Sequence, residues 1–176
     1  MEKLVNGVTL KIIKGDIATQ NDVQAVVNAA NRELRPGGGV AGAIHRAAGP
    51  KLETECRQYT PISPGEAVLT KAYNLPNDHV IHCLGPVYQV DKPHEKLLAD
   101  CYNNTLQIAE DNAIVSVAFP AISTGVFGYP KGEAVKIALQ SVFDKMAELK
   151  HVKLIKFVLF DDETVNLYQE ELAKKV

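Results

Sequence analysis

Cysteine is scarce in this sequence, and its few cysteines form no recognisable ligand or disulfide pattern. Cys56, Cys83 and Cys101 stand far apart, with no CxxC pair and no cluster of His and Cys at zinc spacing. The sequence therefore argues against a disulfide framework and a structural metal, and we expect no metal site and no cofactor. Buried, reduced thiols are typical of a cytoplasmic protein, and this is the compartment we predict.

Long apolar runs and an excess of positive charge are also absent. No run reaches the ~20 apolar residues that span a bilayer, and the first residues lack the apolar core of a signal peptide. The formal net charge of -2 gives no bulk attraction to nucleic acid or to anionic membranes. We therefore expect neither as a partner, and a phosphate-rich ligand would have to be held by local geometry.

Strand and helix patterns, by contrast, alternate along the whole chain. The 176 residues are 46% hydrophobic and 23% charged, as in ordinary globular proteins, and their number fits one domain over residues 1–176. Strands are predicted at residues 8–13, 23–30, 65–73, 79–86, 116–122 and 152–160, and helices at 40–48, 50–59, 97–109, 132–150 and 162–175. Helices between strands imply crossover connections. We predict a three-layer α/β/α sandwich with a mixed, mostly parallel sheet.

A run of three glycines follows the second predicted strand. Gly37, Gly38 and Gly39 stand just before the helix predicted to begin near Val40. Bare glycine amides beside a helix N-terminus form an anion site. The Walker and Rossmann glycine patterns are both absent, which excludes an ordinary NTPase or dehydrogenase. On the triplet alone, a phosphate-binding loop and a flexible surface turn remain equal alternatives.

The layout of strand, glycine-containing loop and helix occurs a second time. The loop after residues 116–122 consists of Ser123, Thr124, Gly125, Val126, Phe127 and Gly128. In open parallel sheets, ligands bind beyond the carboxyl ends of the strands. Two such loops at neighbouring strand ends are therefore predicted to clamp a diphosphate with backbone donors.

A third candidate contact stands at the end of the first predicted strand. Asp16 can accept a hydrogen bond from an exocyclic amine such as that of adenine, while the Ile17 amide donates to the ring. The alternative is that Asp16 only caps the turn that follows it.

Taken together, six segments resemble the macrodomain family, nearest to its MacroD-type branch: KGDIA, VVNAAN, GGGVAGAIHRAAG, GEAVLT, VIHCLGP and AFPAISTGVFGYP. The resemblance extends from about Val8 to Leu172. It implies binding of ADP-ribose, and often hydrolysis of ADP-ribosyl esters on acidic protein side chains or of O-acetyl-ADP-ribose. ADP-ribose, ADP-ribosylated proteins and O-acetyl-ADP-ribose are accordingly the expected partners.

The resemblance also implies roles for single residues. Adenine is expected at Asp16 and the Ile17 backbone, with Phe160 packed against the adenine or its ribose. Asn31 is expected to fix the distal ribose hydroxyls and to serve catalysis, and Asn28 to tie the loop together internally. The residues implied around the diphosphate are Gly37, Gly38, Gly39, Val40 and Ala41 in the first loop and Ser123 to Gly128 in the second.

One position departs from the family pattern. MacroD-type enzymes commonly have an Asp where this chain has Ala41, so a carboxylate general base is missing there. His45 lies on the same helical face four residues later; it is a weak catalytic candidate, and the alternative is a packed structural residue.

Two functions therefore remain in view. We favour a hydrolase that removes mono-ADP-ribose from acidic side chains or deacetylates O-acetyl-ADP-ribose. The alternative is a reader that binds ADP-ribose without turnover. A phosphatase acting on a phosphorylated ADP-ribose would use the same pocket.

Overall fold

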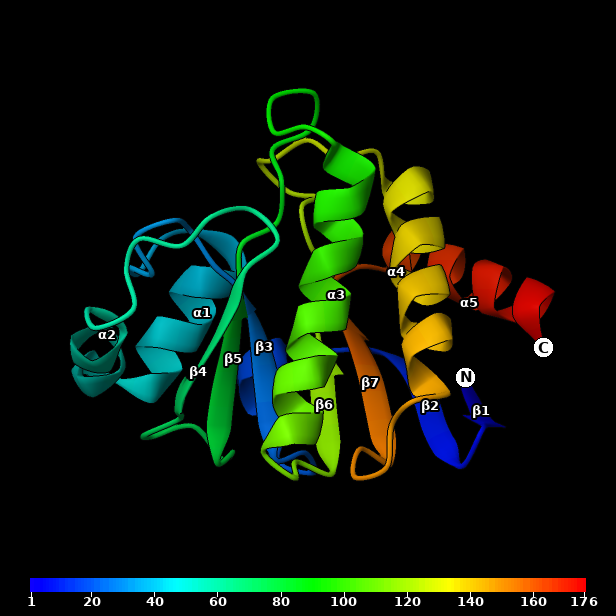
Figure 1. The fold of residues 1–176 in the computed structure, drawn as a ribbon, viewed down its shortest axis with the longest axis horizontal. Helices are drawn as coiled ribbons and strands as arrows, with labels where there is room; N and C mark the ends of the chain where they lie inside the picture. The colour runs from blue at the N-terminus through cyan, green and yellow to red at the C-terminus, as the bar shows by residue number, and fades with distance from the viewer.

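Seven strands form one mixed sheet in the order β1-β2-β7-β6-β3-β5-β4 (Figure 1). The computed structural model describes all residues, 1–176. The strands are β1 (Glu2–Val5), β2 (Val8–Lys14), β3 (Ala25–Ala29), β4 (Ala67–Lys71), β5 (His79–Cys83), β6 (Ser116–Phe119) and β7 (Leu154–Leu159). The five central strands are parallel, and the edge strands β1 and β4 pair antiparallel to their neighbours.

Helices cover both faces of this sheet. They are α1 (Gly39–Ala48), α2 (Pro50–Cys56), α3 (His94–Asp111), α4 (Lys131–Met146) and α5 (Asp162–Lys175), with a short 3₁₀ helix η1 (Ile17–Thr19) after β2. A core of 30 buried residues lies between the sheet and α3, α4 and α5, and a second core of 17 lies under α1, α2 and η1. The predicted three-layer α/β/α sandwich with a mixed, mostly parallel sheet is thus confirmed.

The burial of each element follows from its sequence pattern. β6 is wholly buried and β3 nearly so, as expected of apolar central strands covered on both faces. The buried residues of α3 fall on one helical stripe: Leu98, Cys101, Tyr102, Thr105, Leu106 and Ala109. None of the helices combines the length and apolarity that crossing a bilayer requires.

Two differences from the predicted elements concern ends and edges. β1 was not predicted, and it pairs with β2 across a turn at Asn6 and Gly7. The strands predicted at 65–73 and 79–86 are shorter in the structure, where β4 and β5 contain five residues each.

The parallel strands β2, β7, β6 and β3 all run toward one edge of the sheet, the upper edge in Figure 1. Three of the segments that leave this edge are those singled out by the sequence: residues 15–18, 30–38 and 120–130. The fold therefore brings the predicted loops to the same end of the molecule.

Candidate functional site

Asp16 begins η1 and keeps part of its carboxylate free. Its Oδ1 accepts a hydrogen bond from the Ala18 amide at 2.9 Å, so it caps the 3₁₀ helix. Its second carboxylate oxygen and the Ile17 amide have no hydrogen-bond partner in the chain. The two roles considered for Asp16, cap and adenine contact, are therefore compatible.

Phe160 lies beside this position. The Gly15 amide donates to the Leu159 carbonyl at 2.9 Å, so Asp16 and Phe160 follow the paired ends of neighbouring strands. The Phe160 side chain is 87% exposed. A large apolar ring in water next to a free carboxylate oxygen suits a planar, amine-bearing ring such as adenine.

The glycine run forms the entrance to α1. Gly38 is extended (φ -85°, ψ -179°) and a side chain there would meet no neighbour, whereas Gly39 has φ +54° in the left-handed region. The amides of Gly38, Gly39 and Val40 donate no hydrogen bond within the chain. Together with the helix N-terminus they form a set of unused donors suited to an anion.

The loop of residues 123–128 offers a second set of donors. None of the amides from Ser123 to Phe127 donates a hydrogen bond within the chain. Val126 is 99% exposed, while the half-buried ring of Phe127 packs against the core under α1. Since backbone donors need partners, five consecutive free amides are a strong candidate for oxyanion binding.

Both asparagines of the NAAN motif make definite contacts. Asn31 holds its own loop, because its Oδ1 accepts from the Arg35 amide (2.9 Å) and its Nδ2 donates to the Arg35 carbonyl (2.7 Å). Asn28 was expected to tie the loop together internally. Instead its side chain is fully buried in β3, and its Nδ2 donates to Nδ1 of His82 in β5 at 3.0 Å. The link that Asn28 makes is therefore between strands.

Ala41 and His45 are both 5% exposed on the inner face of α1. The His45 ring centroid lies 6.4 Å from that of His82, and neither His45 nitrogen has a hydrogen-bond partner. Burial lowers the pKa of His45, and burial together with the neighbouring His45 lowers the pKa of His82 to about 3. Both rings are therefore neutral at pH 7. The catalytic role considered for His45 stays a prediction, and its position is that of a packed interior residue.

Sequence reasoning missed three residues that shape these loops. A side chain on Gly42 would meet the Gly37 carbonyl, and one on Gly85 would meet Ile122 and Ser123. The Tyr88 amide donates to the Phe127 carbonyl at 2.9 Å. The glycines were visible in GGGVAG and CLGP, but their contacts join segments that only the fold brings together.

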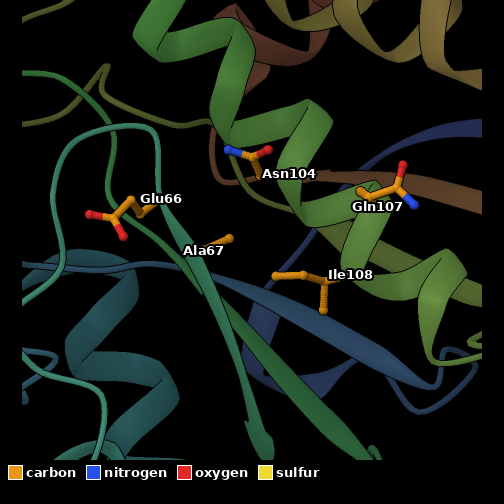
Figure 2. Close-up of a pocket in the computed structure, with 5 residues that line it drawn as sticks. All are labelled: Glu66, Ala67, Asn104, Gln107 and Ile108. Carbon is orange, nitrogen blue, oxygen red and sulfur yellow. The ribbon is translucent and has the colours of Figure 1, made fainter.

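The groove shown in Figure 2 is separate from these loops. It has a volume of about 300 Å³ and lies between β4 and α3, lined by Glu66, Ala67, Asn104, Gln107 and Ile108. None of the candidate site residues is among them.

Known proteins are similar to this chain over most of its length. A family model described as "Macro domain" matches residues 27–138. A Macro domain-containing protein of Mesorhizobium japonicum is 49% identical over 165 residues, 93% of each chain. An O-acetyl-ADP-ribose deacetylase of Cronobacter sakazakii is 46% identical over 170 residues, 94% of each chain.

Solved structures are similar over the same extent. A macrodomain of Oceanobacillus iheyensis with ADP superposes with a TM-score of 0.94 at 40% identity, covering 100% of this chain and 97% of that one. A Trypanosoma brucei macrodomain in complex with ADP-ribose gives a TM-score of 0.85 at 36% identity, covering 93% and 68%.

Proposed function

Because this chain belongs to the Macro domain family, we propose that it binds ADP-ribose and hydrolyses acyl esters on the distal ribose of that ligand. The substrates are O-acetyl-ADP-ribose and mono-ADP-ribose attached to acidic side chains of proteins. Both contain an ester between a carboxylic acid and a ribose hydroxyl. Water attacks the ester carbonyl in each case, the acyl–oxygen bond breaks, and ADP-ribose and the carboxylic acid are released.

The observation that carries this proposal is the pair of unused donor sets. The amides of Gly38 to Val40 and of Ser123 to Phe127 flank the same edge of the sheet and lack partners in the chain. A diphosphate has the acceptor oxygens to satisfy both sets at once. Asp16, with the Ile17 amide and Phe160, then takes the adenine end.

Asn31 can serve the distal ribose without releasing its loop. An Asn side chain has two N–H donors and two acceptor lone pairs, and the contacts with Arg35 use one of each. The remaining donor and lone pair suit a pair of ribose hydroxyls. Asn31 therefore orients the ribose that carries the ester.

Catalysis at this site proceeds without a carboxylate at position 41. The rate then depends on positioning and electrostatics: Asn31 fixes the ribose, and the substrate's own phosphate polarises the attacking water. The loop containing Phe127 covers the reacting end. Misplacement of reacting groups costs orders of magnitude in rate, so Asn31→Ala should reduce turnover far more than affinity.

The test is single-turnover release of ADP-ribose from O-acetyl-ADP-ribose and from a glutamate-linked substrate, with calorimetry of ADP-ribose binding alongside. We expect binding and release by the parent protein, and for Asn31→Ala a loss of release that is much larger than its loss of binding. Absence of any binding heat at millimolar ADP-ribose would refute the function, and undiminished turnover by Asn31→Ala would refute the mechanism.

Ala41 favours a second candidate function, a reader that binds ADP-ribose without turnover. Its side chain is a buried methyl group, which can act neither as an acid nor as a base. Ala41→Asp discriminates between the two functions, because it supplies a general base in the first turn of α1, where the helix dipole favours negative charge. An active parent supports the hydrolase; a silent parent with an active Ala41→Asp variant supports the reader.

We also propose that residues 1–176 form a single macrodomain and that the protein is cytoplasmic. One sheet includes strands from both ends of the sequence, which supports a single domain. The three cysteines are buried and free, as is usual in a reducing compartment.

A further inference from the structure

The loop of residues 123–128 carries many free donors but few contacts that hold its backbone. Two hydrogen bonds are local: the Tyr129 amide donates to the Ser123 carbonyl (2.9 Å), and the Gly128 amide donates to the Gly125 carbonyl (3.0 Å). The only backbone hydrogen bond that joins this loop to another segment comes from Tyr88, whose amide donates to the Phe127 carbonyl at 2.9 Å. The segment between β5 and α3 therefore anchors the loop.

An aromatic cluster fixes Tyr88. Its ring centroid lies 4.9 Å from that of Tyr129 and 4.8 Å from that of His94, and the latter two rings are 5.5 Å apart. The Tyr88 hydroxyl reaches Glu133 at 3.4 Å, and Tyr129 is only 2% exposed. Since Tyr129 directly follows the loop, the cluster holds both the Phe127 carbonyl and the end of the loop.

Gly85 supports the beginning of the same loop. A Cβ atom there would lie 2.7 Å from Cγ2 of Ile122 and would also meet Oγ of Ser123. Ser123 itself is 7% exposed with φ +66°, a left-handed conformation that a serine rarely adopts. Bare backbone at Gly85 is what allows this residue to pack so closely.

These contacts determine where the free amides point. In a trans peptide the C=O and the following N–H point in opposite directions. The Ser123 carbonyl is turned toward the Tyr129 amide, so the Thr124 amide is turned away from it. Fixing the Ser123 carbonyl therefore fixes the direction of the free Thr124 amide. The peptide fixed through the Phe127 carbonyl contains the Gly128 amide, which donates to the Gly125 carbonyl and so closes the turn that contains the other free amides.

We propose that Gly85 and Tyr88 are positioning residues for the ligand, acting through the loop of residues 123–128. They hold the backbone conformation in which its amides meet the diphosphate and its Phe127 end meets the distal ribose. The proposal rests on the proposed function, ADP-ribose binding at these loops. It adds the segment between β5 and α3 to the parts of the chain that determine ligand binding.

The test compares two ligands on one set of variants. ADP-ribose reaches both ends of the site, whereas adenosine reaches only the Asp16 and Phe160 end. Tyr88→Ala removes the aromatic anchor, and Gly85→Ala displaces Ser123. We expect each to weaken ADP-ribose binding about tenfold and to reduce kcat on O-acetyl-ADP-ribose, while adenosine affinity stays unchanged. Tyr88→Phe keeps the ring and should therefore retain ADP-ribose binding and kcat. Glu133→Gln is the matched control for the hydroxyl contact and should resemble the parent.

The outcomes separate this proposal from the one on which it rests. If the parent binds ADP-ribose but folded Tyr88→Ala and Gly85→Ala bind it equally well, the positioning proposal is wrong. Equal losses for adenosine and ADP-ribose would also overturn it, because they indicate general destabilisation. A parent that binds no ADP-ribose contradicts the proposed function itself. Thermal unfolding verifies that each variant is folded, because Tyr88 is partly buried at the margin of the core and Tyr88→Ala removes its packing against Tyr129.

Discussion

Asp16 illustrates how one side chain can have two separable roles. One oxygen caps η1 through the Ala18 amide, and the other is free for a ligand. Asp16→Asn keeps an oxygen for the cap but replaces the second oxygen with a donor that faces the exocyclic amine of adenine. We expect this variant to lose about 1–3 kcal/mol of ADP-ribose binding free energy, with an unchanged thermal midpoint.

Asp16→Ala serves as the comparison, because it removes both contacts. It should lose a similar binding free energy and in addition about 1 kcal/mol of stability from the missing cap. Calorimetry and thermal unfolding of the two variants measure these effects. Full affinity in Asp16→Asn would leave Asp16 as a cap alone.

At the residue scale, the sequence predicts donors and acceptors better than it predicts their supports. The glycine run, Asp16 and Phe160 all lie at the predicted edge of the sheet, because each stands in the segment that follows a strand with a strong pattern. Tyr88 and Gly85 could not be predicted as partners of Phe127 and Ser123. Their contacts depend on the placement of two loops far apart in the chain, which no local pattern encodes.

At the element scale, the start of α1 depends on Gly42. In a helix interior, Gly→Ala normally stabilises by up to about 1 kcal/mol. At Gly42 the new methyl group would meet the Gly37 carbonyl and lie 2.9 Å from the Arg46 guanidinium. We expect Gly42→Ala to shift the glycine run, to destabilise the protein by about 1–3 kcal/mol and to weaken ADP-ribose binding.

Gly132 in α4 provides the matched control. A Cβ atom there meets nothing within 4 Å, so Gly132→Ala should leave ligand binding unchanged and raise the unfolding free energy slightly. Urea unfolding and ADP-ribose titration of both variants give the comparison. Equal stability and equal ADP-ribose affinity of the two variants would mean that neither depends on the close approach of α1 to Gly37.

The strand that sequence reasoning missed shows which elements are hard to predict. β1 has four residues, none of them fully buried, so it lacks the apolar alternation that reveals a half-buried strand. A usable signal was present in Asn6-Gly7, which has φ of +52° and +78° and matches the preferred residues of a two-residue hairpin turn. The longer elements, with buried stripes or runs, were predicted to within a few residues.

At the scale of the whole molecule, a buried polar network joins three strands and makes stability depend on pH. The Asn28 Nδ2 donates to His82 Nδ1, so Nε2 carries the proton and donates to Thr70 Oγ1 at 2.9 Å. A second proton on His82 would face the Asn28 amide and lie in a fully buried site. This arrangement explains why the pKa of His82 falls to about 3, and burial also lowers that of His45.

We therefore expect the protein to lose stability in mild acid. The unfolded chain binds protons on both histidines as the pH falls below about 6.5, whereas the folded chain does not. The contribution of the two neutral histidines to the unfolding free energy is complete above that pH and is lost as the pH falls toward about 3, the pKa of His82 in the folded protein. Urea unfolding at pH 7 and pH 5 samples mainly the histidines, because Asp22, Glu110 and Asp161, whose pKa values the fold lowers, have ordinary values of 3.8 to 4.5.

Two variants test the assignment. His82→Gln should be less stable at both pH values but show a smaller difference between them, since one of the two titrating groups is gone. His151→Gln changes an exposed histidine and should keep the parent's difference. An unchanged pH difference in His82→Gln would exclude His82 as its source.

The free amides of the two loops are dipoles rather than net charges, so ADP-ribose binding through them should depend little on ionic strength. Mobile ions screen separated charges over a Debye length that shrinks from about 10 Å at 0.1 M to about 3 Å at 1 M. Two cations near the site are already paired: Lys14 with Asp162 at 3.1 Å, and Lys131 with Glu163 at 3.1 Å. Donors in direct contact with phosphate oxygens are hardly affected by such screening. ADP-ribose affinity, titrated between these two salt concentrations, should therefore change less than about threefold, and a steep decline would show that charge rather than backbone geometry holds the diphosphate.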